Sequence, residues 1–400
     1  MLTFPPEEHD GPPSNRAATA AHAYPFLFSD EDREEALRTR AVCDARFFTH
    51  DEPRTPAEGV EAGRQVVEDL LAGKLLDAAI GPSDRPRKGS LLRCVTREEV
   101  AYASPLADAI LAVQGLGTHP LALTRKDAPE LLQARRGAAV FGFAVTEPDA
   151  GSDVSRIAVK ACPERGTSRG GVKSGTGWRI TGTKVFISNA GIATHYTVFA
   201  RTAEGKKGVS CFLVEAAKVK TELLDLNAPH PVGVLHFEDT PGSLLGDEGQ
   251  GISLALGTLD VFRPSVGAAA IGMGRRALDE AMLHVAQRTQ FGAPLIENAQ
   301  VQALLADAAT ALEGARALVY RAAWKNDKTD EKATLESAMG KLAATEAAQK
   351  AVDLAVQLSG GLGVLRGRTV EHLYRAVRAL RIYEGASEVM KLVIARELRR

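Results

Sequence analysis

The chain has 400 residues, of which 45% are hydrophobic and 25% charged, and its formal net charge at pH 7 is −1. This length exceeds one ordinary hydrophobic core and predicts about two to three domains, while the composition is that of a folded globular protein. The near-neutral charge excludes a general affinity for nucleic acid or another polyanion and leaves only local basic patches that could hold a phosphate.

The cysteines and histidines give no support for a disulfide framework or a metal centre. Cys43, Cys94, Cys162 and Cys211 lie far apart without paired spacing, and the nine histidines are dispersed along the chain. The N-terminus lacks a basic region followed by an apolar core, and we identify no segment of about 18 apolar residues anywhere in the chain. We therefore expect no membrane association and a reducing, cytoplasmic location.

The N-terminal part reads as an arm followed by helices. Residues 1–24 are rich in proline, alanine and polar residues without a sustained period, which predicts an extended or loosely ordered arm. The acidic segment Ser29-Asp30-Glu31-Asp32 indicates a helix start, and apolar residues recur at helical spacing in 61–71 and 97–116. We interpret residues 1–142 as the arm and a helical domain.

The middle of the chain changes to the period of a β-sheet. Between residues 143 and 249 apolar residues alternate and β-branched residues become frequent. The segments on the two sides of Gly182 read as a hairpin, and 196–199, 209–214 and 232–237 read as further strands. The stretch 163–177, rich in glycine, serine and basic residues, predicts a mobile hairpin loop, for which a simple surface connector is the favoured interpretation.

Residues 250–400 return to long helices. Apolar residues keep a three-four spacing in 301–319 and 335–355, and these stripes suit a four-helix bundle. Asp260 and Arg263 lie three apart on one helical face, and Pro264 removes a backbone donor, so a kink could expose polar groups there. An ordinary intrahelical ion pair is the alternative interpretation.

Near the C-terminus, Glu384 sits between an apolar run and Gly385. Burial there would raise the pKa of the carboxyl towards neutrality, and the missing side chain of Gly385 would let a ligand approach the backbone. These are the conditions for a general base. A helix N-terminus with Ser387 as N-cap would explain the same local sequence, and both interpretations stay open at this point.

A series of motifs in a fixed order distinguishes these interpretations. The motifs are Ala144 to Asp153, Lys184 to Ala190, Arg263-Pro264, Arg288 to Gly292, Gln357 to Gly363 and Tyr383-Glu384-Gly385. Together they resemble the acyl-CoA dehydrogenase family of flavoproteins. The resemblance implies an α+β fold with an N-terminal helical domain (1–142), a middle β domain (143–249) and a C-terminal four-helix bundle (250–400). It also implies a homotetramer made of two dimers.

The resemblance assigns Glu384 as the base that removes the α-proton of an acyl-CoA, with FAD as the hydride acceptor. Some relatives carry the base just before the arginine that matches Arg263, but Phe262 stands there and cannot act as a base. The implied product is a 2,3-enoyl-CoA. The implied electron acceptor is an electron-transferring flavoprotein, in fatty acid or amino acid degradation.

Further positions match cofactor and substrate contacts of the family. Thr146, Phe186 and Ser188 match residues that line the isoalloxazine ring, where hydroxyls bond its polar edge and an aromatic residue covers its face. Segments that reach the FAD of a neighbouring subunit are matched by Arg288, Gln290, Phe291, Gln357, Gly360 and Gly361. Along the substrate, the matching residues are Ser152, Asp260, Arg263 and Gly385. Glu147 and Asp153 could instead cap and brace their turn.

The sequence departs from the family pattern at Gly367, His372, Ala376 and Ala386. These positions bear on the adenosine side of the cofactor and on substrate identity rather than on the reaction class. A same-fold acyl-CoA oxidase or flavin monooxygenase that uses oxygen is one alternative function, and retention of Glu384 argues against the monooxygenase. A non-catalytic acyl-CoA-binding relic without flavin is the other.

Overall fold

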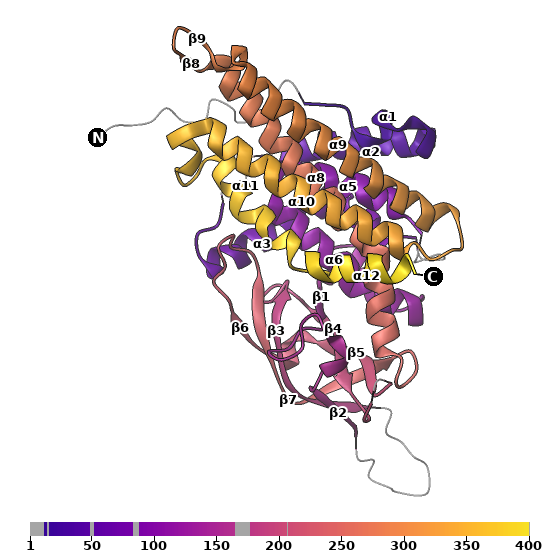
Figure 1. Ribbon diagram of the computed structural model, residues 1–400. Helices are drawn as coiled ribbons and strands as arrows, with labels where there is room; N and C mark the ends of the chain where they lie inside the picture. The colour runs from indigo at the N-terminus through magenta and orange to yellow at the C-terminus, as the bar shows by residue number, and fades with distance from the viewer. Residues whose placement is uncertain are drawn as a thin grey trace, which may run out of the picture. The chain divides into compact units, whose positions relative to one another are not determined.

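The computed structural model describes residues 12–13, 16–48, 52–82, 88–164, 177–205 and 207–399. Its α-helices are α1 (Ala20–Ala23), α2 (Asp30–Arg46), α3 (Pro56–Ala72), α4 (Leu76–Ile80), α5 (Ser90–Ala103), α6 (Pro105–Thr124), α7 (Pro129–Arg135), α8 (Gly251–Gln287), α9 (Ala299–Lys328), α10 (Thr334–Ser359), α11 (Thr369–Val377) and α12 (Ser387–Glu397). Its strands are β1 (Phe141–Ala144), β2 (Lys160–Pro163), β3 (Trp178–Ser188), β4 (His195–Arg201), β5 (Val209–Glu215), β6 (Lys220–Leu223), β7 (Val232–Leu245), β8 (Thr289–Gln290) and β9 (Ala293–Pro294). The predicted α+β order of helices, strands and long helices is confirmed (Figure 1).

Local sequence explains where several helices begin. Helix α2 starts after Ser29, whose side chain accepts from the amide of Asp32 while the Asp32 carboxylate accepts from the amide of Ser29. This reciprocal capping box satisfies two amides that a helix leaves unpaired at its start. Asn298 caps α9 in a similar way by accepting from the amide of Gln300.

Strands β1 to β7 form one seven-stranded sheet in the order β1-β4-β2-β3-β7-β5, with β6 on β7. Because β4 also pairs with β5, the strands β4, β2, β3, β7 and β5 form a closed circuit. Closure protects strand edges that would otherwise be open to pairing with another chain. Buried side chains from several strands, including Ile180, Val198, Phe212 and Phe237, form one apolar cluster of this sheet.

The hairpin predicted on the two sides of Gly182 is wrong, because β3 runs without a break from Trp178 to Ser188. Gly182 lies at an irregularity of the β3–β7 register and has a φ of +137°. A Cβ at this position would come within 2.9 Å of Val159 Cγ2. Gly182 therefore allows a bulge with close packing inside a strand and does not form a turn.

The end of the predicted N-terminal arm is more ordered than expected. Residues 20–23 form α1, and Ala20 and Ala21 are buried. Two buried arginines hold the segment before it, since Arg275 donates to the carbonyl of Ala17 at 3.0 Å and Arg316 to that of Ala18 at 3.2 Å. Residues 1–11, 14 and 15 of the arm, and 165–176 of the predicted loop, lie outside the described residues.

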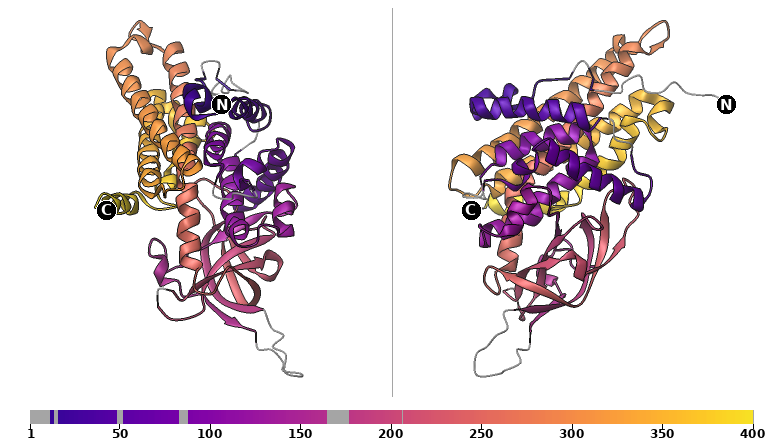
Figure 2. Two further views of the ribbon diagram at one scale, coloured as in Figure 1. Left: turned by 90° about the vertical axis from the view of Figure 1, so that its right-hand side faces the viewer. Right: turned by 180° about the vertical axis from the view of Figure 1, so that it is seen from behind.

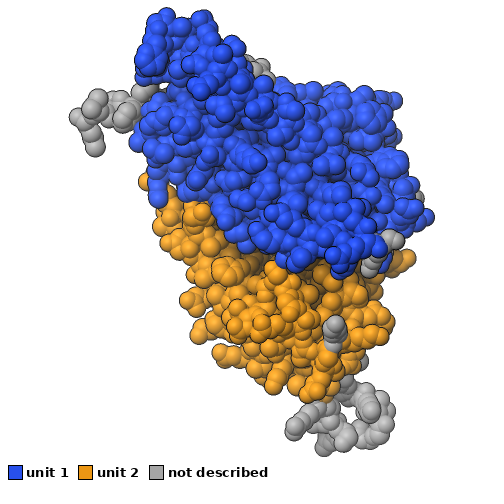
Figure 3. All heavy atoms as spheres, viewed as in Figure 1, with its two compact units in different colours: residues 1–52, 89–108, 260–400 blue, residues 53–88, 109–259 orange. Residues whose placement is uncertain are grey.

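Within the described residues, contacts divide the chain into two compact units (Figure 3). One contains residues 1–52, 89–108 and 260–400, and the other contains 53–88 and 109–259. Helix α5 belongs with the C-terminal helices because it packs on α2 and α9, where buried Glu98 accepts from Tyr320 Oη at 2.8 Å and pairs with Arg316. The division into three domains at 142 and 249 stays a prediction.

Among the described residues, α6 and α8 are long and apolar enough to span a membrane by length and composition. However, 83% of the most apolar window of α6 and 72% of that of α8 are buried in the protein, as is common for core helices. The sequence analysis identified neither helix as an apolar segment of this length, because charged or polar residues interrupt both of them.

Candidate active site

Glu384 lies in the turn between the 3₁₀ helix Arg378–Arg381 and α12. Its φ is +52°, a left-handed conformation that is uncommon outside glycine and must be stabilised by the surroundings. Two buried cations bind the carbonyls of this turn. Arg263 Nε donates to Glu384 O at 3.2 Å, and Lys341 Nζ donates to Gly385 O at 2.6 Å.

Gly385 has a structural reason to be glycine. Its φ is +107°, a region that residues with a Cβ rarely adopt. A Cβ at this position would also come within 2.4 Å of Met390 Cε. The glycine thus permits both the bend after Glu384 and the close packing of α12 against it.

Glu384 is a half-buried residue, and one oxygen of its carboxyl is fully buried. Its Oε2 atom has no hydrogen-bond partner among the residues that the structure describes. Burial raises the pKa of Glu384, which Arg97, Lys341 and Arg263 partly oppose. A buried carboxyl oxygen without a partner is unfavourable in a purely structural role, and groups of this kind are concentrated at functional sites.

Four charged residues surround Glu384, and each comes from a different helix. The sequence analysis identified Arg263 of α8 but missed Arg97, Asp108 and Lys341. Arg97 of α5 donates from Nε and Nη2 to the two carboxylate oxygens of Asp108, each at 2.8 Å, and from Nη1 to Ser265 Oγ at 3.0 Å. Lys341 of α10 is the third missed residue. In the sequence, each of these three residues is only a charged side chain on an apolar helix face. Its role can be interpreted only when the helix that packs against that face is known.

Asp260 and Arg263 of α8 contact each other, so the intrahelical ion pair considered as an alternative does form. Asp260 Oδ2 also accepts from Thr334 Oγ1 at 3.0 Å. Since Arg263 additionally contacts the carbonyl of Glu384, the structure brings Asp260, Arg263, Glu384 and Gly385 into one cluster. Burial lowers the pKa of Arg263 although Asp260 and Glu384 act in the opposite direction.

Phe186 combines an exposed aromatic ring with a strained backbone. Its φ is +57°, it lies at a register irregularity between Lys184 and Ile187, and the residue is 64% exposed. Buried Lys184 anchors the bulge by donating to Val145 O and Glu147 Oε1, each at 2.8 Å. The bulge therefore turns a large aromatic side chain outward at a fixed point of β3.

Thr146 and Ser188 flank this bulge and are partly exposed, and the Thr146 carbonyl accepts from the amide of Val185 at 3.0 Å. Ser152 is exposed in the turn after β1. Glu147 and Asp153 brace this turn. Glu147 Oε2 accepts from the amide of Ala158 at 2.7 Å, and Asp153 caps a short 3₁₀ helix.

Arg288, Gln290 and Phe291 belong to the exposed β8–β9 hairpin, and Phe291 at its tip has a φ of +52°. In Figures 1 and 2 this hairpin and α12 lie at opposite ends of the long helices. Within one chain, the structure does not bring these three residues to Glu384. Their exposure suits contacts to another subunit.

The turn after α10 is open. Gly360 has a φ of +58°, and its amide donates to the carbonyl of Gln357. A Cβ added at Gly360 or Gly361 would meet nothing within 4 Å. Packing inside the chain therefore does not explain the second glycine, and the accessible backbone of both suits close approach of a ligand.

Comparison with known proteins shows the family. Residues 142–240 match the acyl-CoA dehydrogenase middle domain, and residues 249–399 match the acyl-CoA dehydrogenase C-terminal domain. The cyclohexane-1-carbonyl-CoA dehydrogenase of Geobacter metallireducens is 36% identical over 326 residues, 78% of this chain and 82% of that protein. The chain belongs to the acyl-CoA dehydrogenase family.

Further relatives extend the match over nearly the whole enzyme. The probable acyl-CoA dehydrogenase fadE25 of Mycobacterium bovis is 34% identical over 395 residues, 94% of this chain and 97% of that protein. The butyryl-CoA dehydrogenase structure from Megasphaera elsdenii has a TM-score of 0.80 and 27% identity, covering 93% of this chain and 99% of that chain. This acyl-CoA dehydrogenase is therefore an oxidoreductase that acts on CH–CH bonds of acyl-CoA substrates, and FAD is its cofactor.

The residues of the enzyme fit a flavin. A planar ring system needs an apolar face to cover it and hydroxyls near its polar edge. The exposed ring of Phe186 and the partly exposed side chains of Thr146 and Ser188 supply these groups within one unit. At Gly360 and Gly361 no side chain would keep a ligand away from the backbone, because even an added Cβ would meet nothing within 4 Å.

Position 262, which the sequence analysis considered as the other place for a base, holds an aromatic residue that cannot act as one. Phe262 is buried, and the guanidinium of Arg93 lies 4.3 Å from the centre of its ring. No acidic group stands there, and Glu384 is the acid of the candidate site that lacks a hydrogen-bond partner at Oε2 among the described residues.

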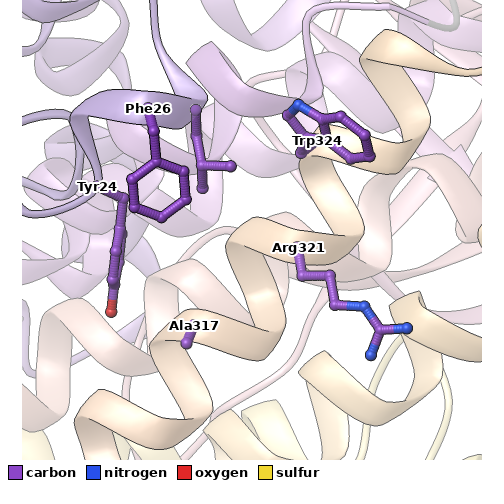
Figure 4. Close-up of a pocket in the computed structure, with 6 residues that line it drawn as sticks. Tyr24, Phe26, Ala317, Arg321 and Trp324 are labelled. Atoms are coloured by element: carbon purple, nitrogen blue, oxygen red, sulfur yellow. The ribbon is translucent and has the colours of Figure 1, made fainter.

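One pocket of the structure contains none of the predicted site residues. It is lined by Tyr24, Phe26, Leu27, Ala317, Arg321 and Trp324 (Figure 4). Its lining joins the segment before α2 to one face of α9, away from the motifs of the family. The candidate site is thus defined by the chemistry of its residues and not by this pocket.

Proposed function

We propose that Glu384 removes the α-proton of an acyl-CoA thioester, and that the enzyme forms the 2,3-enoyl-CoA. The observation that supports this most strongly is the buried Oε2 of Glu384, which has no partner among the described residues and lies in a turn bound by two cations. Oε2 is therefore free to accept the proton from the α-carbon of a bound substrate.

The surroundings of Glu384 suit a base that works near neutral pH. Burial raises the pKa of its carboxyl and so increases its basicity, while Arg97, Lys341 and Arg263 act against full neutralisation. We assign the backbone amide of Glu384 to the thioester oxygen, where a hydrogen bond would stabilise the negative charge that develops as the proton leaves. When bound, FAD supplies the acceptor for the β-hydride, which no side chain can take.

We assign Phe186 to the face of the flavin ring and Thr146 and Ser188 to its polar edge. The second set of cofactor contacts is assigned to the FAD of a neighbouring subunit, and it comprises Arg288, Gln290, Phe291, Gln357, Gly360 and Gly361. Ser152, Asp260 and Arg263 are assigned to the substrate side, together with Gly385. The exposure of the β8–β9 hairpin supports the contact between subunits.

This arrangement makes at least a dimer necessary for cofactor binding, and we propose a homotetramer made of two dimers. An electron-transferring flavoprotein is the proposed acceptor, because the enzyme belongs to a family of dehydrogenases and retains Glu384. The cytoplasm is the proposed location, in agreement with four cysteines that are all free.

The experiment that tests this function is anaerobic mixing of the FAD-loaded enzyme with a panel of straight, branched and cyclic acyl-CoAs. We expect at least one of them to bleach the flavin and to yield one enoyl-CoA per flavin reduced. Turnover in air without an added acceptor, with release of hydrogen peroxide, would identify an oxidase instead. A folded, colourless protein that cannot be reconstituted with FAD would contradict the proposal.

A second expected result concerns the subunit contact. Arg288→Ala should weaken FAD retention on dilution, because an exposed guanidinium assigned to the pyrophosphate would be lost while the fold is untouched. FAD per chain after gel filtration at decreasing concentration measures the effect. Arg321→Ala, whose side chain is 62% exposed, is the matched control. Full retention of FAD by a proven monomer would overturn the assignment.

A further inference from the structure

We propose that Lys341 is a positioning residue for the base, whose ammonium fixes the Glu384–Gly385 turn and serves as the counter-charge of the Glu384 carboxylate. This inference rests on the proposed role of Glu384. It concerns a residue that no motif of the sequence singled out.

The first argument is the contact of Lys341 with the turn. Its side chain comes from the N-terminal half of α10, is 0% exposed and donates to Gly385 O at 2.6 Å. Arg263 binds the neighbouring carbonyl of Glu384 from α8. The left-handed conformation of Glu384 is thus held from two helices, and loss of either donor would allow the turn to relax.

The second argument is the pairing of charges around the turn. Arg97 is neutralised by Asp108, and Arg263 by Asp260. Lys341 has no carboxylate within ion-pair distance among the described residues, and Glu384 likewise has no cation within that distance. Lys341 and Glu384 are therefore the cation and the anion that remain, and they attract each other electrostatically without direct contact.

The electrostatics of both groups agree with this pairing. Burial lowers the pKa of Lys341 to about 8, and the largest interaction that opposes the shift is that with Glu384. In turn, Lys341 is one of the cations that lower the pKa of Glu384 against the effect of burial. The titratable and charged groups that act on the pair are Arg97, Asp108, Arg263, Glu346, Arg381 and Tyr383, and Asp260 and Arg396 act in turn on Arg263.

The consequence follows from the sign of the interaction. A nearby cation favours the ionised carboxylate, so its removal raises the pKa of Glu384. More of Glu384 is then protonated at neutral pH and unable to accept the α-proton. Loss of the hydrogen bond to Gly385 O adds a positional defect to this electrostatic one.

The test compares Lys341→Met, which removes charge and donor, with Lys341→Arg, which retains both. The first readout is the rate of anaerobic flavin reduction by a substrate from the acyl-CoA panel, measured against pH. The second is the infrared carbonyl band of protonated Glu384 followed against pH, identified by its absence in Glu384→Gln. Lys350→Met on the exposed face of α10 is the matched control.

We expect Lys341→Met to move the acid limb of the rate profile and the infrared midpoint upward by about 1 pH unit, the lower end of shifts caused by one nearby charge. Lys341→Arg should restore most of both, and Lys350→Met should change neither. Where Lys341→Met yields too little folded enzyme, Lys341→Gln is measured in the same way, since it also removes the charge.

Two outcomes would overturn the inference. One is a parental rate profile and infrared midpoint in Lys341→Met. The other is a slow Lys341→Met enzyme whose midpoints have not moved and which Lys341→Arg does not rescue, as for a residue that only supports packing. Failure of the proposed function would look different, because Glu384→Gln would then reduce its flavin at the parental rate.

Discussion

Glu384→Gln should slow flavin reduction by an acyl-CoA by about 10²–10⁴-fold, the usual contribution of a positioned general base. Glutamine keeps the size of the side chain but cannot accept the α-proton. Because Oε2 of Glu384 has no hydrogen-bond partner among the described residues, the substitution breaks no contact at that atom. The variant should therefore fold, retain FAD and bind acyl-CoA.

Anaerobic stopped-flow mixing of the FAD-loaded variant with the best substrate of the panel measures this effect. Glu388→Gln is the matched control, since Glu388 lies four residues further on and is exposed in the first turn of α12. We expect the control to reduce its flavin at the parental rate. If Glu384→Gln did the same, the base would lie elsewhere and the proposed mechanism would be wrong.

The order of the helices and strands could be predicted from the sequence, and Glu384 could be identified as the candidate base. Both depend on local patterns. Helical periodicity shows which residues face a core, and the Tyr-Glu-Gly segment is contiguous in the chain. The family assignment from motifs is confirmed by the comparisons. The hairpin at Gly182 failed because a glycine inside a strand pattern fits either a turn or a bulge. The register of β3 on β7 decides between them.

The charged surroundings of the candidate base could not be predicted from local patterns. Lys341 reaches Gly385 across 44 positions of sequence, and Arg97 reaches Ser265 across 168. Such contacts depend on how α5, α8 and α10 pack. The left-handed backbone of Phe186 and Glu384 could not be predicted either, because neither phenylalanine nor glutamate favours a positive φ.

Asp108→Ala should destabilise the enzyme by about 3–5 kcal/mol, because it leaves the charge of Arg97 buried without the carboxylate that neutralises it. Both side chains of this pair are only 1% exposed. Burial by itself lowers the pKa of Arg97, but the charge and hydrogen bonds of Asp108 outweigh burial, and the pKa is raised. Removal of the carboxylate reverses this balance and leaves Ser265 as a neutral partner of the guanidinium.

Urea-induced unfolding of the FAD-loaded enzyme measures the free energy of unfolding for this comparison. Asp77→Ala is the control, because its partner Arg135 lies at 2.6 Å but Asp77 is 67% exposed. An exposed pair of this kind contributes about 0–1 kcal/mol. If Asp108→Ala cost no more than Asp77→Ala, the guanidinium of Arg97 would have to move and reach water in the variant. Arg97 would then no longer act as a fixed cation beside Glu384, and the acid limb of the rate profile should shift with it.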